Sequence, residues 1–379
     1  MIEKKIKILQ IGFSSNPGGV ENLVYSYFKH IDKNKFEFDF LDMYGDGIAY
    51  ANEIEKLGGR IFSIENYKRH PLKACIKLKD LLNKERYDIV HVHMQSAANL
   101  MPIIIPYLHR EEVVIAHSHS SSTPKGMLRK LLNSLNVKLL RKLKVEKWAC
   151  GATAGIWMWG DKFDKENIIP NAIEAGLFEY DEKVRNKIRK QCGILPNERV
   201  IGFVGRFGDE KNTFFLIDVL KELLRKQDNY KLLTVGGNGL YDEFVKKIKQ
   251  EHLEDKYYSA GIQLSTKEWY QAMDAFLLPS FFEGFPVVGV EAQAAGLKCF
   301  FSNNISKEID ISGTNYFLPI EKASIDAQIW AEEINNIISS ENRKILLNQK
   351  YDIKYAINIL QKKYYHILEN RGLYHVEKH

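Results

Sequence analysis

Two glutamates separated by seven residues, Glu283 and Glu291, stand in the segment LPSFFEGFPVVGVEAQAAG. Eight residues of helix rise about 12 Å, and a nucleotide sugar needs its sugar and its ribose held at the two ends of a diphosphate over a comparable distance. Carboxylates accept hydrogen bonds from vicinal hydroxyls, so the spacing suits such a ligand. Gly284 allows a tight turn, and Pro286 suits the first turn of a helix, whose N–H groups and dipole attract an anion. The alternative is that Glu283 belongs to a structural turn and Glu291 to a solvated helix face.

Two cations, Arg206 and Lys211, lie in the segment GRFGDEKN, directly after an expected strand. A leaving diphosphate develops negative charge as the glycosidic bond breaks, and fixed cations stabilise that charge more in the transition state than in the ground state. Arginine offers a planar fork of donors and lysine a point charge. We therefore expect this loop to bind phosphates; an ordinary basic surface loop is the alternative.

Four histidines end two expected strands, as the pairs His91-x-His93 and His117-x-His119. One interpretation is a metal site, because histidine pairs at strand ends are typical of metal-dependent hydrolases. Such a site would also need acidic ligands after later strands, and the sequence offers no convincing set. The other interpretation, which the sequence favours, is one histidine that hydrogen-bonds the substrate among ordinary core or loop histidines, with no metal bound.

Glycines occupy two of the loops that follow strands. Gly18 and Gly19 join the first expected strand to the first helix in NPGGVE, and paired glycines let a backbone approach a ligand closely. The segment GGNG, residues 236–239, follows a later strand but lacks the full spacing of a dinucleotide-binding loop. A structural turn remains the alternative at both positions.

Strand and helix patterns alternate through both halves of the chain, which predicts parallel sheets with helices on both faces. In open sheets of this kind, ligands bind beyond the carboxyl ends of the strands, where the loops named above lie. We expect strands at 7–13, 36–43, 60–63, 89–94 and 113–117 in the first half, and at 199–204, 231–235 and 275–278 in the second.

The length of 379 residues suits two domains, since a domain commonly has roughly 100–200 residues. We expect an α/β protein with two doubly wound, Rossmann-like domains that face a central cleft. The expected boundaries are 1–175 and 176–350. A long amphipathic helix at about 351–375 is expected to pack back on the first domain.

The composition narrows the class of protein. A net charge of +6 fits anionic small molecules or a membrane surface and does not indicate nucleic acid. The four cysteines form no CxxC pair, so a reducing compartment is the simplest interpretation. No stretch reaches the roughly 18 apolar residues that span a bilayer. Residues 125–147 combine leucines at helical spacing with lysines and arginines, which is typical of a helix on anionic lipid or of one packed on its own domain.

The pattern EGFPVVGVE resembles the E-x7-E motif of GT-B glycosyltransferases, in particular of glycosyltransferase family 4 and its capsular and exopolysaccharide branch. The resemblance runs through nearly the whole chain. It implies that Glu283 contacts hydroxyls of the donor sugar and that Glu291 contacts the nucleotide ribose. It also implies that Arg206 and Lys211 bind the diphosphate. Asn212 departs from the family, in which glycine is frequent at this position.

The resemblance also implies roles for the remaining loops. It makes the first domain the acceptor side and the second the nucleotide-sugar side. It places a histidine near the reacting sugar; His119 fits that position best, and His117 is the alternative. The expected catalytic residues are therefore His119, Glu283, Arg206 and Lys211, and the expected donor-binding residues are Gly18, Gly19, Gly237, Ile262, Gly284, Phe285, Pro286, Val287 and Glu291.

The implied reaction is transfer of a sugar, with retention of anomeric configuration, from a nucleotide diphosphate sugar to a glycan or lipid-linked acceptor. UDP is the expected nucleotide and GDP the alternative. The sequence has no D-x-D motif, which GT-A transferases use to hold a metal, so we expect a metal-independent front-face reaction and no cofactor. The alternatives are a nucleotide-sugar epimerase, a metal-dependent hydrolase and a sugar-nucleotide binder without activity. The family's acceptors imply a cytoplasmic protein that contacts the inner face of the membrane through 125–147.

Overall fold

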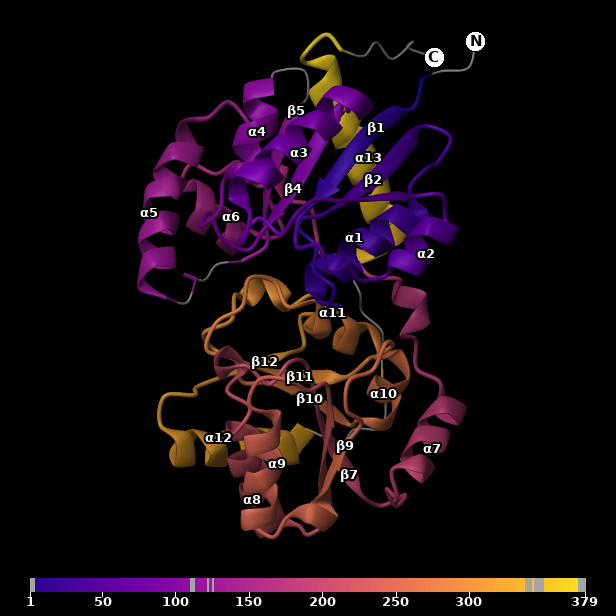
Figure 1. Cartoon of the computed structure of the whole chain (residues 1–379). Coiled ribbons are helices and arrows are strands. Elements are labelled where there is room, and N and C mark those ends of the chain that lie inside the picture. Colours follow the sequence, from indigo (N-terminus) through magenta and orange to yellow (C-terminus); the bar gives the residue numbers. More distant parts are fainter. Residues whose placement is uncertain are drawn as a thin grey trace. The chain divides into compact units, whose positions relative to one another are not determined.

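The computed structural model describes residues 4–109, 113–120, 123–124, 126–337, 343 and 351–373. The chain divides into two compact units, Met1–Ala172 with Ile353–His379 and Ile173–Asp352. The last helix therefore belongs to the first unit (Figure 1). Each unit has its own parallel sheet.

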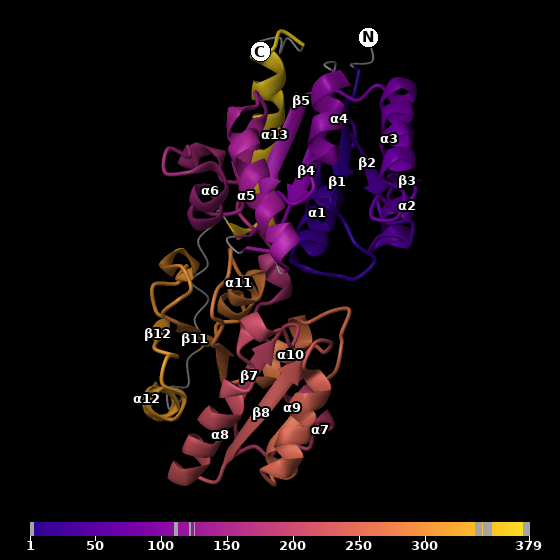
Figure 2. The same ribbon diagram turned by 60° about the vertical axis from the view of Figure 1, so that its left-hand side comes forward.

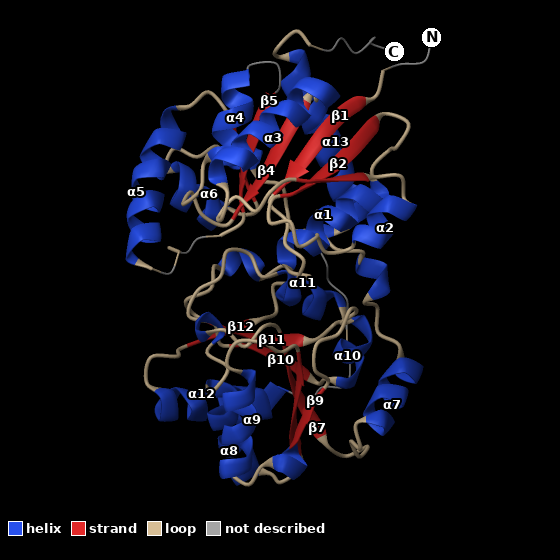
Figure 3. Ribbon diagram, viewed as in Figure 1, coloured by secondary structure: helices blue, strands red, loops and turns tan. Residues whose placement is uncertain are grey.

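The first unit contains a six-stranded sheet in the order β3-β2-β1-β4-β5-β6, with helices on both of its faces (Figure 3). Its strands are β1 (Ile6–Ile11), β2 (Phe36–Asp42), β3 (Arg60–Ser63), β4 (Ile89–Met94), β5 (Val113–Ser118) and β6 (Glu146–Ala149). Its helices are α1 (Gly19–His30), α2 (Ala51–Lys56), α3 (Pro71–Glu85), α4 (Met101–His109), α5 (Met127–Lys142), α6 (Ala152–Trp159) and α13 (Ile353–Glu369).

The apolar residues of β1 show why this sheet is covered on both faces. Successive residues of a strand point to opposite faces. Ile6 and Ile8 belong to one buried core, which residues of α1 and α13 complete, whereas Leu9 and Ile11 belong to a second core with residues of α3, α4 and α6. Figure 2 shows α13, the last helix of the chain, running along this sheet.

The second unit contains another six-stranded parallel sheet, in the order β12-β11-β10-β7-β8-β9. Its strands are β7 (Arg199–Val204), β8 (Tyr230–Val235), β9 (Tyr257–Ser259), β10 (Ala275–Leu278), β11 (Lys298–Ser302) and β12 (Tyr316–Leu318). Its helices are α7 (Glu182–Gln191), α8 (Phe215–Lys226), α9 (Tyr241–Gln250), α10 (Lys267–Ala272), α11 (Val287–Ala294) and α12 (Ala323–Ile337).

Both sheets follow one strand order. Numbered within its own unit, each sheet runs 3-2-1-4-5-6, so β1 adjoins β4 and β7 adjoins β10. The winding of the chain reverses at these pairs, and ligands of doubly wound sheets bind beyond the carboxyl ends of such strands. The loops after β1, β4, β7 and β10 therefore hold the candidate sites.

The predicted α/β class with two doubly wound sheets is confirmed. One predicted helix start was wrong by one residue. Pro286 is the N-cap of α11 and not part of its first turn. Among the described residues, we find no helix of the length and hydrophobicity that a membrane span requires.

Candidate active site

The loops after β7 and β10 place a lysine against a glutamate in the second unit. Lys211 Nζ lies 2.5 Å from Glu283 Oε1, and both side chains are largely buried. The Ser280 hydroxyl donates to the same carboxylate oxygen at 2.7 Å. The backbone N–H of Phe281 donates to the Glu210 carbonyl at 2.8 Å, which ties the two loops together. The structure thus brings two of the expected site residues into direct contact.

Arg206 lies on the same loop as Lys211 but makes a different ion pair. Its guanidinium lies 2.6 Å from Glu210 Oε1, and its side chain is 67% exposed. Burial acts to raise the pKa of Glu210, but the Arg206 guanidinium and a backbone N–H lower it below its ordinary value. Arg206 is thus a solvent-facing cation paired within its own loop, whereas Lys211 pairs with the loop after β10.

Glu291 lies on α11 with its carboxylate buried. Tyr270 donates to Oε2 at 2.8 Å, and Thr266 donates to the same oxygen at 3.2 Å. Burial raises the pKa of Glu291 to about 7, although the two hydrogen bonds act to lower it. The carboxylate is therefore held in place by two donors and lacks a cationic partner in these contacts, which suits an acceptor for ligand hydroxyls.

The glycine turn after β8 packs against the loop after β7. A Cβ atom on Gly236 would lie 2.0 Å from the Gly205 carbonyl oxygen, and one on Gly239 would lie 2.2 Å from that of Phe207. Leu240 N–H donates to the same Phe207 oxygen at 2.7 Å. The sequence left a simple tight turn open as the explanation; the structure shows that the two glycines let adjacent loops approach closely.

Other expected donor-binding residues of this unit divide into exposed and packed ones. Ile262 is exposed and follows Gly261, whose carbonyl accepts from Gly236 N–H. Gly237 lies beside it, since a Cβ on Gly237 would be 3.1 Å from the Ile262 side chain. Phe285 is buried and stacks on Tyr351 with ring centroids 5.3 Å apart. The Phe285 ring therefore supports the turn through packing, and Gly284, Pro286 and Val287 lead from that turn into α11.

In the first unit, the loop after β1 folds over the start of α1. Glu21 is buried, and its Oε1 accepts from the Ser14 N–H at 3.0 Å and from the Ser14 hydroxyl at 2.8 Å. Gly18 is the N-cap of α1, and a Cβ there would lie 2.7 Å from Glu21 Oε2. Gly19 is the first residue of the helix. Gly18 thus makes room for the glutamate that closes the loop.

The four histidines lie together at the ends of β4 and β5. His117 is inside β5 and buried, with its Nδ1 3.1 Å from His91 Nε2, whereas His119 follows the strand and lies 2.9 Å from His93. Burial lowers the pKa of each ring, to about 3 for His119 and well below 6.5 for the others. All four rings are therefore neutral at physiological pH. His119 stands beyond the strand end, the position at which sheets of this class bind ligands.

Three of these histidines are close enough to hold a metal ion. One ring nitrogen from each of His91, His93 and His117 lies within 4.8 Å of the others. Hydrogen bonds already use nitrogens of all three rings, to each other and to Gln10 and Tyr364. The acidic ligands that a hydrolase would need are not part of this cluster of described residues.

Comparisons with known proteins identify the chain's family. Residues 17–154, in the first unit, match the model of glycosyltransferase family 4, and residues 184–353, almost all in the second, match that of glycosyl transferases group 1. The chain belongs to glycosyltransferase family 4. Its expected membership of this family and its expected glycosyltransferase activity are thereby confirmed.

This family 4 glycosyltransferase has relatives along most of its length. It is 28% identical over 337 residues to EpsF of Bacillus subtilis, assigned as a glycosyltransferase, with 86% of either chain covered. It is 25% identical over 380 residues to the UDP-Gal:alpha-D-GlcNAc-diphosphoundecaprenol alpha-1,3-galactosyltransferase of Escherichia coli, with 91% of this chain and 93% of the relative covered. It is also 25% identical over 348 residues to the capsular polysaccharide biosynthesis glycosyltransferase CapH of Staphylococcus aureus, with 88% and 91% covered.

Solved structures share the fold of this family 4 enzyme. Anabaena HepE in complex with UDP and glucose has a TM-score of 0.77 at 18% identity, covering 95% of this chain and 99% of HepE. WaaG, a glycosyltransferase involved in lipopolysaccharide biosynthesis, has a TM-score of 0.67 at 14% identity, covering 93% and 99%. The predicted GT-B fold is confirmed.

Sequence reasoning missed several polar side chains of the family 4 enzyme's candidate sites. Ser280, Thr266 and Tyr270 orient the two glutamates, and Gln10 and Tyr364 bond to the histidines. The signal for Gln10 was present, because it is a lone amide in the otherwise apolar strand IKILQI. Tyr364 gave no such signal, since tyrosines on an amphipathic helix are ordinary.

Proposed function

We propose that this enzyme transfers a sugar, with retention of configuration, from a UDP-sugar to a glycan or lipid-linked acceptor during synthesis of a surface polysaccharide. The observation that carries the proposal is the contact of Lys211 with Glu283 at the carboxyl edge of β7 and β10. A cation suits a phosphate and a carboxylate suits sugar hydroxyls. The two chemistries of a nucleotide sugar thus stand side by side in one unit.

The names of similar proteins support the donor and the acceptor classes. The Escherichia coli relative uses UDP-Gal and acts on a diphosphoundecaprenol-linked sugar, and CapH belongs to capsular polysaccharide biosynthesis. HepE, of the same fold, was solved with UDP and glucose. We therefore favour UDP over GDP, and propose that the first unit serves the acceptor and the second the nucleotide sugar.

Donor binding is proposed to exchange the partners of the ion pairs. In the structure, Lys211 pairs with Glu283 and Arg206 pairs with Glu210. A diphosphate draws Lys211 and Arg206 towards its oxygens, and Glu283 then accepts hydrogen bonds from sugar hydroxyls. Glu291, held by Tyr270 and Thr266, accepts from the ribose hydroxyls. The backbone of 284–287, at the start of α11, adds N–H groups and the positive end of the helix dipole.

The reaction is proposed to proceed on one face of the sugar. The bond from the anomeric carbon to the phosphate oxygen breaks, the acceptor oxygen bonds to the same face of that carbon, and the departing phosphate takes the acceptor's proton. Lys211 and Arg206 stabilise the charge that develops on the diphosphate. His119 is proposed to hydrogen-bond the transferred sugar, and Gly18 and Gly19 to let the loop after β1 approach the donor.

We propose that these cations replace a metal ion and that no cofactor takes part. Chelator should then leave the transfer rate unchanged. The family match favours a transferase. It gives no support to an epimerase or a hydrolase. A binder without activity would bind UDP tightly and turn over no acceptor.

The experiment that tests the proposal uses the whole enzyme, a panel of UDP- and GDP-sugars and a lipid-linked glycan acceptor. A thermal-shift screen first selects the nucleotide sugars that stabilise the protein. Mass spectrometry then detects the extended glycan, and NMR defines its anomeric configuration. We expect a UDP-sugar to give an α-linked product from an α-linked donor. Inversion, or stabilisation by no nucleotide sugar, would contradict the proposal.

A second part of the proposal is contact with the inner face of a membrane through α5. Leu128, Leu131 and Leu135 are 68%, 57% and 55% exposed, so these three leucines are not covered by their own unit. Leu140 and Asn133 hold α5 in place: Leu140 is buried in the core, and the Asn133 side chain accepts from Ala97 N–H at 2.8 Å. Exposed lysines and arginines share the helix: Arg129, Lys130, Lys138, Arg141 and Lys142. Leucines beside cations fit an anionic lipid surface; Lys125, at the start of the proposed segment, lies outside the described residues.

Sedimentation with lipid vesicles tests this contact. The enzyme is expected to bind phosphatidylglycerol vesicles and to bind phosphatidylcholine vesicles weakly. Replacing Leu131 and Leu135 by serine should abolish binding, whereas serines at the exposed Leu195 and Leu264 of the second unit should not. Equal binding by both double variants would show that α5 is not the contact.

A further inference from the structure

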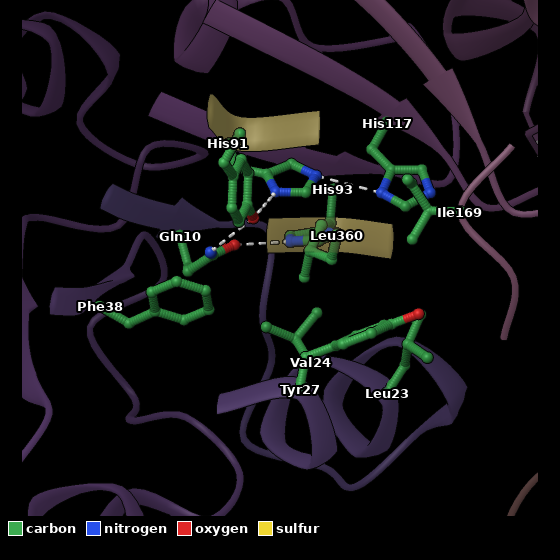
Figure 4. A pocket seen from close by; sticks show the side chains of 11 residues that line it. Gln10, Leu23, Val24, Tyr27, Phe38, His91, His93, His117, Ile169 and Leu360 are labelled. Carbon is green, nitrogen blue, oxygen red and sulfur yellow. Dashed lines mark hydrogen bonds between the residues drawn. The ribbon is translucent and has the colours of Figure 1, made fainter. Parts of the chain in front are cut away.

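A largely buried branch of hydrogen bonds runs across three neighbouring strands of the first unit, β1, β4 and β5. It joins Gln10 of β1, His93 of β4 and His119, which follows β5. His93 Nε2 lies 2.9 Å from Gln10 Oε1, and His93 Nδ1 lies 2.9 Å from His119 Nε2. Figure 4 shows Gln10 and His93 bonded in this way on one side of a pocket, with Val24 and Tyr27 of α1 on the other.

The chemistry of these groups dictates where the protons lie. An amide oxygen only accepts, so His93 Nε2 donates to Gln10 Oε1. A neutral imidazole carries one N–H, so His93 Nδ1 is an acceptor and His119 Nε2 donates to it. Burial lowers the pKa of both rings, which keeps them neutral. His119 therefore carries its proton on Nε2 and has its lone pair on Nδ1.

A second branch starts from the other end of the Gln10 amide. Gln10 Nε2 donates to the Tyr364 hydroxyl at 3.4 Å, and that hydroxyl donates to His91 Nδ1 at 2.7 Å. His91 Nε2 then donates to His117 Nδ1 at 3.1 Å, which puts the His117 proton on Nε2. A reversed amide would reverse every donor in both branches. The structure places Gln10 Oε1 towards His93 and Gln10 Nε2 towards Tyr364, and this orientation sets the direction of both branches. His117 Nε2 has no hydrogen-bond partner among the described residues.

We propose that Gln10 is a positioning residue, which acts through His93 to hold His119 in its Nε2–H tautomer with Nδ1 offered to the ligand as a hydrogen-bond acceptor. The inference rests on the proposed function in one respect, the role of His119 at the donor sugar. A lone pair on Nδ1 accepts from a sugar hydroxyl. It repels a fluorine at the same position, so the tautomer selects donors that keep the hydroxyl.

Nitrogen NMR of the whole enzyme with 15N-labelled histidines tests the tautomer without any substrate. Protonated and bare ring nitrogens have separate 15N shifts, and a His119→Asn variant assigns the His119 signals. In the wild type, we expect His119 to carry its proton on Nε2 and none on Nδ1. In Gln10→Leu, this tautomer should no longer be the most populated one. Tyr27→Phe is the matched control, because it removes a buried hydroxyl from the same pocket but leaves the branch intact. The control should keep the wild-type pattern.

Three results would overturn the proposal. These are a wild-type His119 with its proton on Nδ1, an unchanged tautomer in folded Gln10→Leu, or a stoichiometric metal on the histidines of the purified enzyme. Transfer assays give an independent measurement. Gln10→Leu should lower kcat/KM roughly ten- to hundredfold, the usual range for a lost partner that orients a functional histidine, and should tolerate a deoxyfluoro donor better than the wild type does. If Gln10→Leu shifts the His119 tautomer but transfers sugar at the wild-type rate, then Gln10 does position His119. In that case His119 does not act at the donor sugar, and its role in the proposed function would be wrong.

Discussion

The second unit places charged side chains at the end of its sheet, whereas the first unit places neutral rings there. Beyond β7 and β10, Lys211 and Glu283 form an ion pair. At the ends of β4 and β5, four histidines bond to each other and to Gln10 and Tyr364, and burial keeps the rings neutral. Both sheets have one strand order. The loop and strand-end sequences, and not the topology, therefore decide which polar site forms.

The two regions should respond to pH in opposite directions, and the histidines should give the larger effect. Below about pH 6.5 the histidines of the unfolded chain become protonated, whereas the buried rings of the folded protein stay neutral. The free energy of unfolding therefore falls as the pH drops. Each histidine contributes up to about 1.4 kcal/mol per pH unit in that range. Urea unfolding from pH 5 to 8, with ring NMR of the folded protein, measures this. Folded rings that titrate near pH 6.5 would refute the neutral cluster.

Replacing Lys211 by alanine should cost the most activity. It removes the buried cation that we propose to face the departing diphosphate, and such losses commonly lower kcat by 10²–10³-fold. Transfer assays should show this fall, with circular dichroism confirming the fold. Lys249→Ala, an exposed lysine on α9, is the control and should retain wild-type rates. Equal rates in the two variants would show that the charged edge, formed by Lys211 and Glu283 beyond β7 and β10, does not bind the donor.

Replacing Glu291 by glutamine should stabilise the protein and weaken UDP binding. Burial raises the pKa of Glu291 to about 7 from 4.5, so the folded state holds a proton that the unfolded chain has lost between these pH values. Stability therefore falls as the pH rises through this window, and the variant should gain up to about 3 kcal/mol at pH 8 and almost nothing at pH 4. Denaturation at the two pH values and UDP titration check both effects. If Glu291→Gln is no more stable than the wild type at pH 8, burial does not destabilise the Glu291 carboxylate.

Replacing Arg206 by alanine should have the smallest effect. Its side chain is mostly exposed and already paired with Glu210, and exposed charges contribute little. We expect UDP to bind roughly three- to tenfold more weakly, as measured by calorimetry, with a smaller loss at high salt. A loss as large as that of Lys211→Ala would show that Arg206 moves into a buried position when the donor binds.

The sequence predicted the fold, and it singled out Lys211 and Glu283, which the structure brings into contact. Their spacing and motif made Glu283, Glu291 and Lys211 recognisable, because the side chains of a short loop after a strand can occupy few positions in space. The same reasoning could not predict that Arg206 pairs with Glu210, since an exposed arginine has many rotamers. It also left the Phe285 ring among the donor residues, although Tyr351 covers it from far along the chain.

The first unit's site depends on pairs that are remote in sequence. Gln10 and Tyr364 meet only because α13 returns to the first unit, across 354 positions. The choice between His117 and His119 depended on where β5 ends, and element ends are the least certain part of any pattern. The strand includes Ser118, so His117 lies within the sheet and His119 beyond it.

The most direct test of the charged edge is to compare UDP binding with sugar transfer in Glu283→Gln. The glutamine keeps the size of the side chain but removes its charge, and Glu268→Gln, on the exposed face of α10, serves as the control. We predict that UDP affinity stays within about threefold of the wild type, because UDP lacks the transferred sugar that residue 283 is proposed to bind, while kcat/KM for transfer falls at least about 100-fold. Transfer at the wild-type rate in Glu283→Gln would contradict the account.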